Sequence, residues 1–352
     1  MIEHDIADPR AVFDDHVKGR RSIYLDTNVW IDLAEGGSDV ARETLSLARL
    51  VQRSGLAIFP LSYASITEFL KQPPRRRLLV QAHIMDELSE GVSFRAWRHI
   101  RALEVRRIYE YMVQGEACSH YDEVFTVTAC YLGDASLEYP EGTPPALAAA
   151  MTEDIIQATP GVNWFLEHIG DDDYRARYTQ GDQEWLTEIE RRNAAAESKL
   201  INADGTPSAK LLRYEEHYFV FREYVLKLLP RVVGIAAVYF ALRRFQSRGV
   251  RGSSATLARG INVMPYESLT CEMHIQRRLN RDRPPQLQDF YDYDHAGLGV
   301  GYCDAFATSD GELIDLLRRS GVQRRFRSTI LRGLPDLRRY RQDCADEKTV
   351  TA

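Results

Sequence analysis

Four acidic residues stand where the chain is expected to leave a buried strand or to enter a helix: Asp26, Glu68, Asp294 and Asp310. Asp26 follows an apolar segment at residues 22–25, and Asp310 ends a second one at residues 303–310. Open α/β sheets bind their ligands outside the carboxyl ends of the strands. Carboxylates gathered there repel each other at neutral pH, and a hard divalent cation relieves that repulsion. The pattern therefore predicts a site for Mg²⁺ or Mn²⁺, which prefer oxygen ligands.

Two further acids, Asp292 and Asp304, lie close to these positions in the sequence and are candidates for additional metal ligands. Asp292 competes with Asp294 for the third ligand position, and we favour Asp294 because it opens a helix beside His295. Side chains next to the acids are expected to orient ligands or water: Thr27, Asn28 and Thr308. Each acid also has a structural alternative, in which it caps a helix, forms a turn or lies solvated on a helix surface.

The elements that must position these acids alternate between strand and helix at both ends of the chain. Near the N-terminus, apolar runs at residues 22–25 and 56–60 predict strands, and a helical pattern follows each of them. Near the C-terminus, predicted strands at residues 303–310 and 325–331 flank a helix at residues 311–321 whose last glycine ends it. Alternation of this kind predicts a parallel sheet with helices on its faces.

The chain between these two ends carries mostly helical patterns and includes an acidic segment at residues 134–190. That segment repels polyanions, and it is a candidate for docking a protein partner or inhibitor. We predict an α/β fold: a three-layer, Rossmann-like parallel sheet formed by both chain ends, with a large, mostly α-helical insertion. The expected division is a first α/β part, the insertion and a second α/β part, at residues 20–74, 75–287 and 288–345.

The bulk composition limits the classes of protein that fit. Of 352 residues, 44% are apolar and 27% are charged, as in ordinary globular domains, and the net charge of −6 gives no general attraction to nucleic acid. The five cysteines form no Cys-x-x-Cys pair, which favours a reducing compartment. The acidic N-terminus lacks the apolar core of a signal peptide, and no apolar run is long enough for a bilayer span. We therefore expect a cytoplasmic protein without membrane contact.

Three segments resemble motifs of the PIN-domain nucleases and follow in the order of that family. The first acid lies in "YLDTNVWIDL", the second in "SITEFL", and the third and fourth in "YDYDHAGLGVGYCDAFATSD". The last segment is also similar to a PIN-like subgroup in which Asp-x-x-His, Tyr-Cys-Asp and Thr-x-Asp follow one another. The resemblance covers residues 20–71 and 288–341, and the insertion between them has no counterpart in small PIN proteins.

The resemblance implies a metal-dependent nuclease that acts on phosphodiester bonds, usually of RNA. By motif match, one or two Mg²⁺ or Mn²⁺ ions are held by Asp26, Glu68, Asp294 and Asp310, activate water and stabilise charge on the scissile phosphate. Two alternatives stay open: a non-catalytic PIN-like scaffold that binds nucleic acid or protein, and a DNA-directed nuclease of defence or repair. Ligands of one hard cation must come within about 4–7 Å of one another, whereas acids that only cap helices are dispersed.

Basic residues on both sides of the α/β segments are candidates for binding nucleic acid. Arg75 and Arg76 begin the insertion, and Arg277 and Arg278 come near its end, shortly before the third acid. His295 is a further candidate for contact with the substrate. Arginines on amphipathic helices also form solvated faces or internal ion pairs, and this is the competing interpretation.

Overall fold

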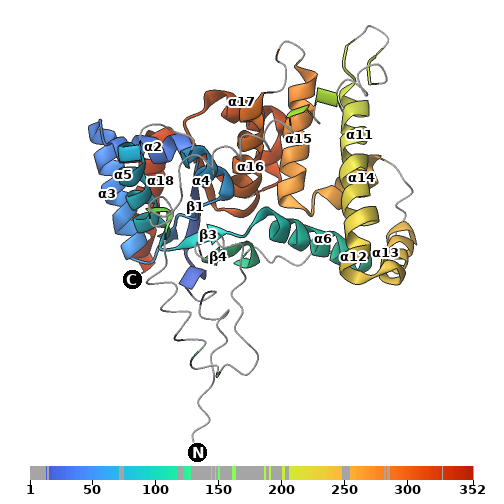
Figure 1. The fold of residues 1–352 in the computed structure, drawn as a ribbon, viewed down its shortest axis with the longest axis horizontal. Coiled ribbons are helices and arrows are strands. Elements are labelled where there is room, and N and C mark those ends of the chain that lie inside the picture. Colours follow the sequence, from blue (N-terminus) through green and yellow to red (C-terminus); the bar gives the residue numbers. More distant parts are fainter. Residues whose placement is uncertain are drawn as a thin grey trace, which may run out of the picture.

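The computed structural model describes residues 13, 16–70, 75–116, 122–127, 144, 147, 150, 161–163, 186–187, 190–191, 200–202, 206–247, 254–280, 283, 286–326 and 328–351 (Figure 1). Most of the acidic segment at residues 134–190 lies outside this part of the chain. The side chains of Arg75 and Arg76 also lie outside it, so their predicted contact with nucleic acid stays a prediction.

The predicted α/β fold with a parallel sheet built from both chain ends is confirmed. Four strands pair in the order β2-β1-β5-β6, and all three pairings are parallel. The strands are β1 (Arg21–Leu25), β2 (Ala57–Ile58), β5 (Ala305–Thr308) and β6 (Thr329–Arg332). Because a strand from the end of the chain lies directly beside β1, residues near 26 and near 308 meet at one edge of the sheet.

Alternating residues of the central strand face two different cores. Ile23 and Leu25 on β1 pack into a core that also includes Leu33 and Leu337, while Tyr24 faces the opposite side of the sheet. The helices of the first layer are α2 (Thr27–Glu35), α3 (Asp39–Arg53), α4 (Tyr63–Leu70), α5 (Arg75–Ser89) and α18 (Gly333–Thr351). Figure 1 shows α3, α5 and α18 together on one side of β1.

Small residues allow the second helical layer to approach the sheet closely. The helices of this layer are α15 (Pro265–Leu279), α16 (Leu287–Tyr302) and α17 (Gly311–Ser320), and the short η3 (Val322–Arg324) follows them. A Cβ placed on Gly299 of α16 would lie 2.5 Å from a ring carbon of Phe306 and 2.7 Å from one of Tyr24. The glycine-rich helix sequence "HAGLGVGY" therefore fits against β1 and β5 where larger side chains would clash.

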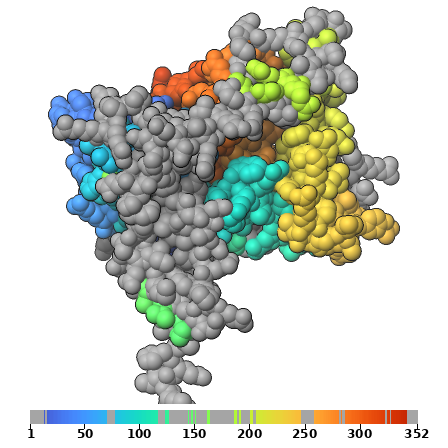
Figure 2. All heavy atoms as spheres, viewed as in Figure 1, coloured from blue at the N-terminus to red at the C-terminus, as the bar shows by residue number. Residues whose placement is uncertain are grey.

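The middle region builds a third core and a two-stranded antiparallel sheet. The core brings together α6 (Trp97–Gln114), α11 (Ala209–Phe221), the π-helix η2 (Arg222–Leu228), α12 (Leu229–Val233), α13 (Ile235–Ser247) and α14 (Ser254–Ile261). The strands are β3 (Val92–Phe94) and β4 (Phe125–Val127), the second preceded by η1 (Asp122–Val124). In Figure 2, α11 to α14 form the side of the molecule away from α3.

The packing does not separate at the predicted boundary between residues 74 and 75. Leu78, Met85 and Leu88 of α5 belong to the same core as β1, and Phe94 of β3 packs with Tyr24 on the other face. Both elements therefore belong to the α/β layers, although sequence patterns placed them in the insertion. No helix among the described residues is long and apolar enough to cross a membrane.

Candidate metal centre

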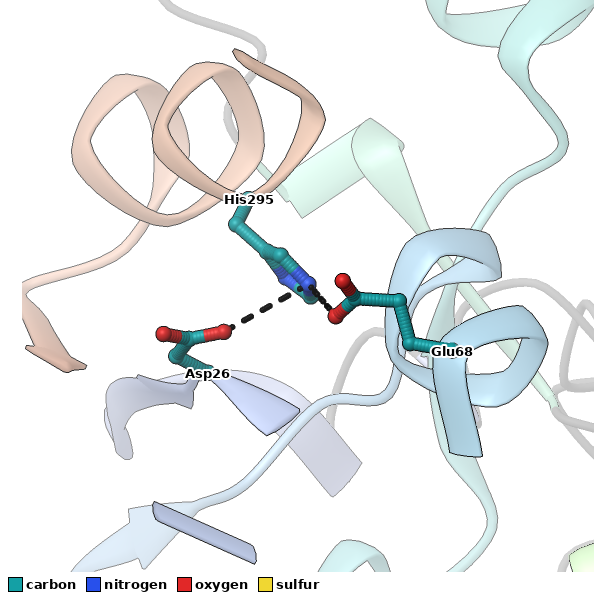
Figure 3. A group of neighbouring side chains, drawn as sticks. All are labelled: Asp26, Glu68 and His295. Atoms are coloured by element: carbon teal, nitrogen blue, oxygen red, sulfur yellow. Dashed lines mark hydrogen bonds and ion pairs between the residues drawn. The ribbon is translucent and has the colours of Figure 1, made fainter. Parts of the chain in front are cut away.

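Three side chains with metal-binding groups converge at the carboxyl end of β1: Asp26, Glu68 and His295 (Figure 3). Asp26 comes directly after β1, Glu68 lies on α4, and His295 lies on α16. Glu68 and His295 are 227 residues apart in the sequence. The parallel sheet brings them together because the helices that follow or precede its central strands meet at this edge.

The three side chains are close enough to share one cation. The Nε2 atom of His295 lies 2.8 Å from Oε2 of Glu68 and 3.5 Å from Oδ1 of Asp26. One ligand atom of each residue lies within 4.8 Å of the other two. Ligands on opposite sides of a small divalent ion, with bonds of about 2.1 Å, stand about 4.2 Å apart. A small inward shift of the side chains therefore suffices for all three to bind one ion.

Two threonine hydroxyl groups hold the carboxylates in place. Thr308 at the end of β5 donates to Oδ2 of Asp26, and Thr27 donates to Oε2 of Glu68, each at 2.6 Å. Such bonds favour the ionised carboxylates and fix their orientation, which is what the predicted orienting role requires. Asn28, the third residue of that prediction, is exposed on α2.

A buried hydroxyl network supports the other side of the imidazole ring. The hydroxyl oxygen of Tyr24 lies 2.6 Å from Nδ1 of His295, and it also hydrogen-bonds the hydroxyls of Ser62 and Ser65. A proton on Nδ1 that is donated to the tyrosine oxygen leaves the Nε2 lone pair facing the two carboxylates. Histidine ligands of metals are commonly oriented in this way, by a hydrogen bond from the second ring nitrogen.

The charges of the three groups shift one another's pKa values. Burial raises the pKa of Asp26 above its ordinary range, although the charge of His295 and the Thr308 hydroxyl oppose this. Burial also disfavours the Glu68 carboxylate. The charge of His295 and the hydrogen bonds that Glu68 accepts outweigh burial and lower the pKa of Glu68. Burial lowers the pKa of His295, yet Tyr24 and the two carboxylates raise it well above its ordinary value. A protonated His295 therefore balances the two acids, and a metal ion bound at Nε2 would replace the proton on that nitrogen.

Asp292 borders the group from the same face of α16 as His295. Its Oδ1 accepts a hydrogen bond from the amide of Gln288, which also donates to Glu68 at 2.8 Å. Burial and then the negative charge of Asp310 raise the pKa of Asp292 to about 7. Asp292 therefore lies close enough to the other acids at this edge of the sheet for their negative charges to raise its pKa.

Asp310 has a structural role at the same edge. It is the N-cap of α17, and its Oδ1 accepts from two backbone N–H groups in the first turn of that helix. Its own N–H donates to Thr308, which in turn donates to Asp26. The helix-capping alternative therefore holds for Asp310, and Asp26 similarly caps α2 by accepting from the N–H of Thr27. Neither cap disperses the acids, because both helices begin at the same edge of the sheet.

Asp294, which we favoured over Asp292 from the sequence, faces away from this group. Its Oδ1 accepts a hydrogen bond from the hydroxyl of Tyr266 on α15, and burial raises its pKa to about 6. Each residue turns a helix by about 100°, so Asp294 points about 200° from Asp292 on α16. The geometry favours Asp292 for the third position that the sequence assigned to Asp294.

Asp304 lies at the opposite end of the sheet. Its Oδ2 accepts from the backbone N–H and the hydroxyl of Ser22, at 2.7 and 3.0 Å. Both residues stand at the amino ends of their strands, four residues before Asp26 and Thr308. At about 3.3 Å per residue this is about 13 Å from the metal-binding group. The structure therefore does not bring Asp304 to this group, and its carboxylate instead joins β5 to β1.

The structure gives Arg277 and Arg278 structural partners in place of a nucleic acid. Both side chains are more than nine-tenths buried, with 6% and 8% of their surface exposed. The carboxylates that pair with these guanidinium groups belong to Asp289, Asp292, Glu312, Glu215 and Glu216. The competing interpretation of internal ion pairs therefore holds at these two positions.

Sequence reasoning missed the histidine as a member of the group with Asp26 and Glu68, and it missed the tyrosine that orients the histidine ring. His295 was expected to contact substrate, and Tyr24 appeared only as an apolar residue of the first strand. One signal was available: Asp292 and His295 are three residues apart, and helical residues at that spacing lie on one face. No sequence signal shows that Tyr24 reaches Nδ1, because that contact depends on how α16 packs over β1.

Comparison with protein-family models, with curated proteins and with solved structures found no match to this chain. The similarity to PIN nucleases consequently rests on the order of the motifs. The geometry adds an independent observation, the convergence of acids and a histidine at the carboxyl edge of a parallel sheet.

Proposed function

We propose that this protein is a metal-dependent nuclease of the PIN-like type, which hydrolyses phosphodiester bonds of RNA. The observation that carries the proposal is the group of Asp26, Glu68 and His295, whose ligand atoms lie within 4.8 Å of one another. The helix-cap interpretation expects dispersed acids, whereas Asp26 and Glu68 lie together in this group. The preference for RNA comes from the motif resemblance.

The donor set suits Mn²⁺ or Mg²⁺, and it favours Mn²⁺. Two carboxylates are hard ligands that both ions accept, whereas the imidazole nitrogen of His295 suits a transition metal better than Mg²⁺. Such an ion would supply Lewis-acid polarisation of the phosphate and lower the pKa of water. The chain's own part is to hold the ligands: Thr308 fixes Asp26, and Tyr24 fixes the ring of His295.

A basic side chain of the chain itself lies at the same edge of the sheet. Arg332 ends β6 in register with Thr308, the residue that bonds Asp26. Its side chain is exposed, and it forms no ion pair with any carboxylate in the described part of the chain. One guanidinium nitrogen lies 3.9 Å from the place of a Cβ on Gly311, at the start of α17. In this proposal Arg332 binds a phosphate oxygen of the substrate, a contact that suits the arginine fork.

The experiment that tests the proposal is cleavage of labelled single-stranded RNA, tRNA and DNA with Mn²⁺, Mg²⁺ or EDTA. We expect cleavage of RNA that needs the metal and is lost in Asp26→Asn. The matched control is Asp304→Asn, which changes an acid at the opposite end of the same sheet and should retain cleavage. Cleavage of DNA alone would replace the RNA preference by the DNA-directed alternative.

Two results would overturn the proposal. One is the absence of cleavage of every substrate by a folded parent protein that is saturated with Mn²⁺. The other is cleavage in which Asp26→Asn and the parent are equally active, because the metal-binding group would then take no part. The first result would favour the non-catalytic scaffold, and the second would show that any cleavage is independent of the group of Asp26, Glu68 and His295.

A further inference from the structure

A second chemically distinctive site lies on the opposite side of α16 from the metal centre. It is a pocket of about 560 Å³ between α16, α15, α11, α6 and the start of α4. The rings that line it belong to Tyr63, Trp97, Phe219, Tyr224, Tyr266, Phe290 and Tyr293. Figure 1 shows α15 and α16 between the sheet and α11. The pocket's size and its aromatic walls suit a ring-shaped ligand.

The polar groups of the pocket select the ligand further. Four carboxylates line it, so a phosphate would be repelled, and the ligand must offer hydrogen-bond donors. Glu216 and Glu223 already form ion pairs with basic residues, and Glu267 accepts a hydrogen bond from the hydroxyl of Tyr224. Asp294 is 7% exposed and accepts from Tyr266, and it pairs with no lysine or arginine in the described part of the chain. Asp294 is therefore the acceptor that the pocket offers to a ligand.

An organic cation would also bind well to aromatic rings beside acids, but a cationic side chain of the protein already occupies this position. The guanidinium group of Arg101 lies 4.7 Å from the ring centre of Trp97 and 4.9 Å from that of Tyr224. This cation fills the place between the two rings and would repel a second one. Trp97 still exposes 46% of its surface, so its indole is available for stacking.

We propose that this pocket binds a guanine base of the nucleic acid. Among the four bases, guanine alone presents two adjacent donors, N1–H and N2–H₂, and a carboxylate such as Asp294 accepts both. Trp97 and Phe290 supply ring faces, and stacking of this kind contributes substantially to the binding of single strands. Binding of the free base stands by itself, whereas its use in substrate selection rests on the proposed nuclease function.

The position of the pocket relates the base to the cleaved bond. Asp294 and His295 are consecutive on α16, and Tyr63 begins the helix that carries Glu68. The pocket and the metal centre therefore lie about one helix diameter apart, 10–12 Å. With about 3.4 Å per nucleotide in a stacked strand, a strand that passes around α16 from one site to the other spans at least about three nucleotides. A guanine in the pocket would place the cut at a constant, short distance along the RNA.

Binding of guanosine, measured by isothermal titration calorimetry on the full chain, tests the pocket without any cleavage. We expect guanosine to bind at least about tenfold more tightly than adenosine, as one bidentate base contact provides. Trp97→Ala and Asp294→Asn should each weaken guanosine at least about tenfold, while Asp26→Asn should bind it like the parent. Tetramethylammonium serves as the probe for the organic-cation alternative.

The outcomes separate the two proposals. Guanosine that does not bind, that binds no better than adenosine, or that binds equally well to both pocket variants would overturn the guanine site. Binding of tetramethylammonium in its place would do the same. RNAs with a single, moved guanosine complete the test: the cut should move with the guanosine, and Trp97→Ala should lose this dependence while still cleaving. Guanosine binding without cleavage of any RNA would support the guanine site and reject the proposed nuclease function.

Discussion

The stability of the folded protein should depend on Mn²⁺ through Asp26. A ligand that binds only the folded state at one hundred times its Kd stabilises that state by about 2.7 kcal/mol. Unfolding changes the entropy by about 2.1 cal/mol/K per residue, or about 0.7 kcal/mol/K for a chain of 352 residues. The expected rise in Tm is therefore about 4 °C if the chain unfolds as one unit, and EDTA should reverse it.

Differential scanning calorimetry with increasing Mn²⁺ measures this shift. Asp26→Asn removes one of three ligands, and its Tm should be nearly independent of Mn²⁺ over the same concentrations. Asp304→Asn also loses a strand-end carboxylate, but one that lies about 13 Å away. Mn²⁺ should therefore raise the Tm of this variant above its own metal-free Tm by as much as it does for the parent. Mn²⁺ that leaves the Tm of the parent unchanged, or that stabilises Asp26→Asn as strongly, would refute the metal-centre assignment.

Three further predictions concern packing, protonation and substrate contact. Gly299→Ala should lower the free energy of unfolding by about 1–3 kcal/mol, because its Cβ would overlap Phe306, while Gly37→Ala should change it by less than about 0.5 kcal/mol; urea unfolding compares them. Burial and the charge of Glu267 raise the pKa of Glu104 to about 8 from an ordinary 4.5. Between pH 5 and 8 the folded state binds one more proton than the unfolded state, so the free energy of unfolding should fall by up to about 1.4 kcal/mol for each unit that the pH rises. Equal pH slopes in the parent and Glu104→Gln would contradict this. Arg332→Ala should lower kcat/KM for RNA at least about tenfold through the lost phosphate contact, without loss of the Mn²⁺-dependent Tm shift.

Local patterns in the sequence predicted the elements well at both ends of the chain. Apolar runs located β1 and β5, Gly321 marked the end of α17, and the strand–helix alternation implied a parallel sheet. The acids that follow β1 and β5 were found for the same reason. A residue directly after a strand must emerge at its carboxyl end, whatever the rest of the fold does.

Residues in the middle of helices could not be assigned in this way, because only packing decides which face of a helix meets the sheet. Asp292 and Asp294 differ in sequence by two positions, yet one borders the candidate metal centre and the other lines an aromatic pocket. Likewise, the sequence shows Arg277 as a basic residue on a helix, while burial makes it an internal ion-pair partner.

The sequence by itself therefore determined the strands, their parallel arrangement and the two acids that emerge from the central strands. Tertiary structure alone decided that His295 completes the group with Asp26 and Glu68, and that Tyr24 orients its ring. The physical reason is the range of the interactions. Hydrogen bonds along a strand or helix involve near neighbours, whereas the metal-binding group needs α16 to lie over β1. That close approach depends on small residues such as Gly299, together with the packing of the whole sheet.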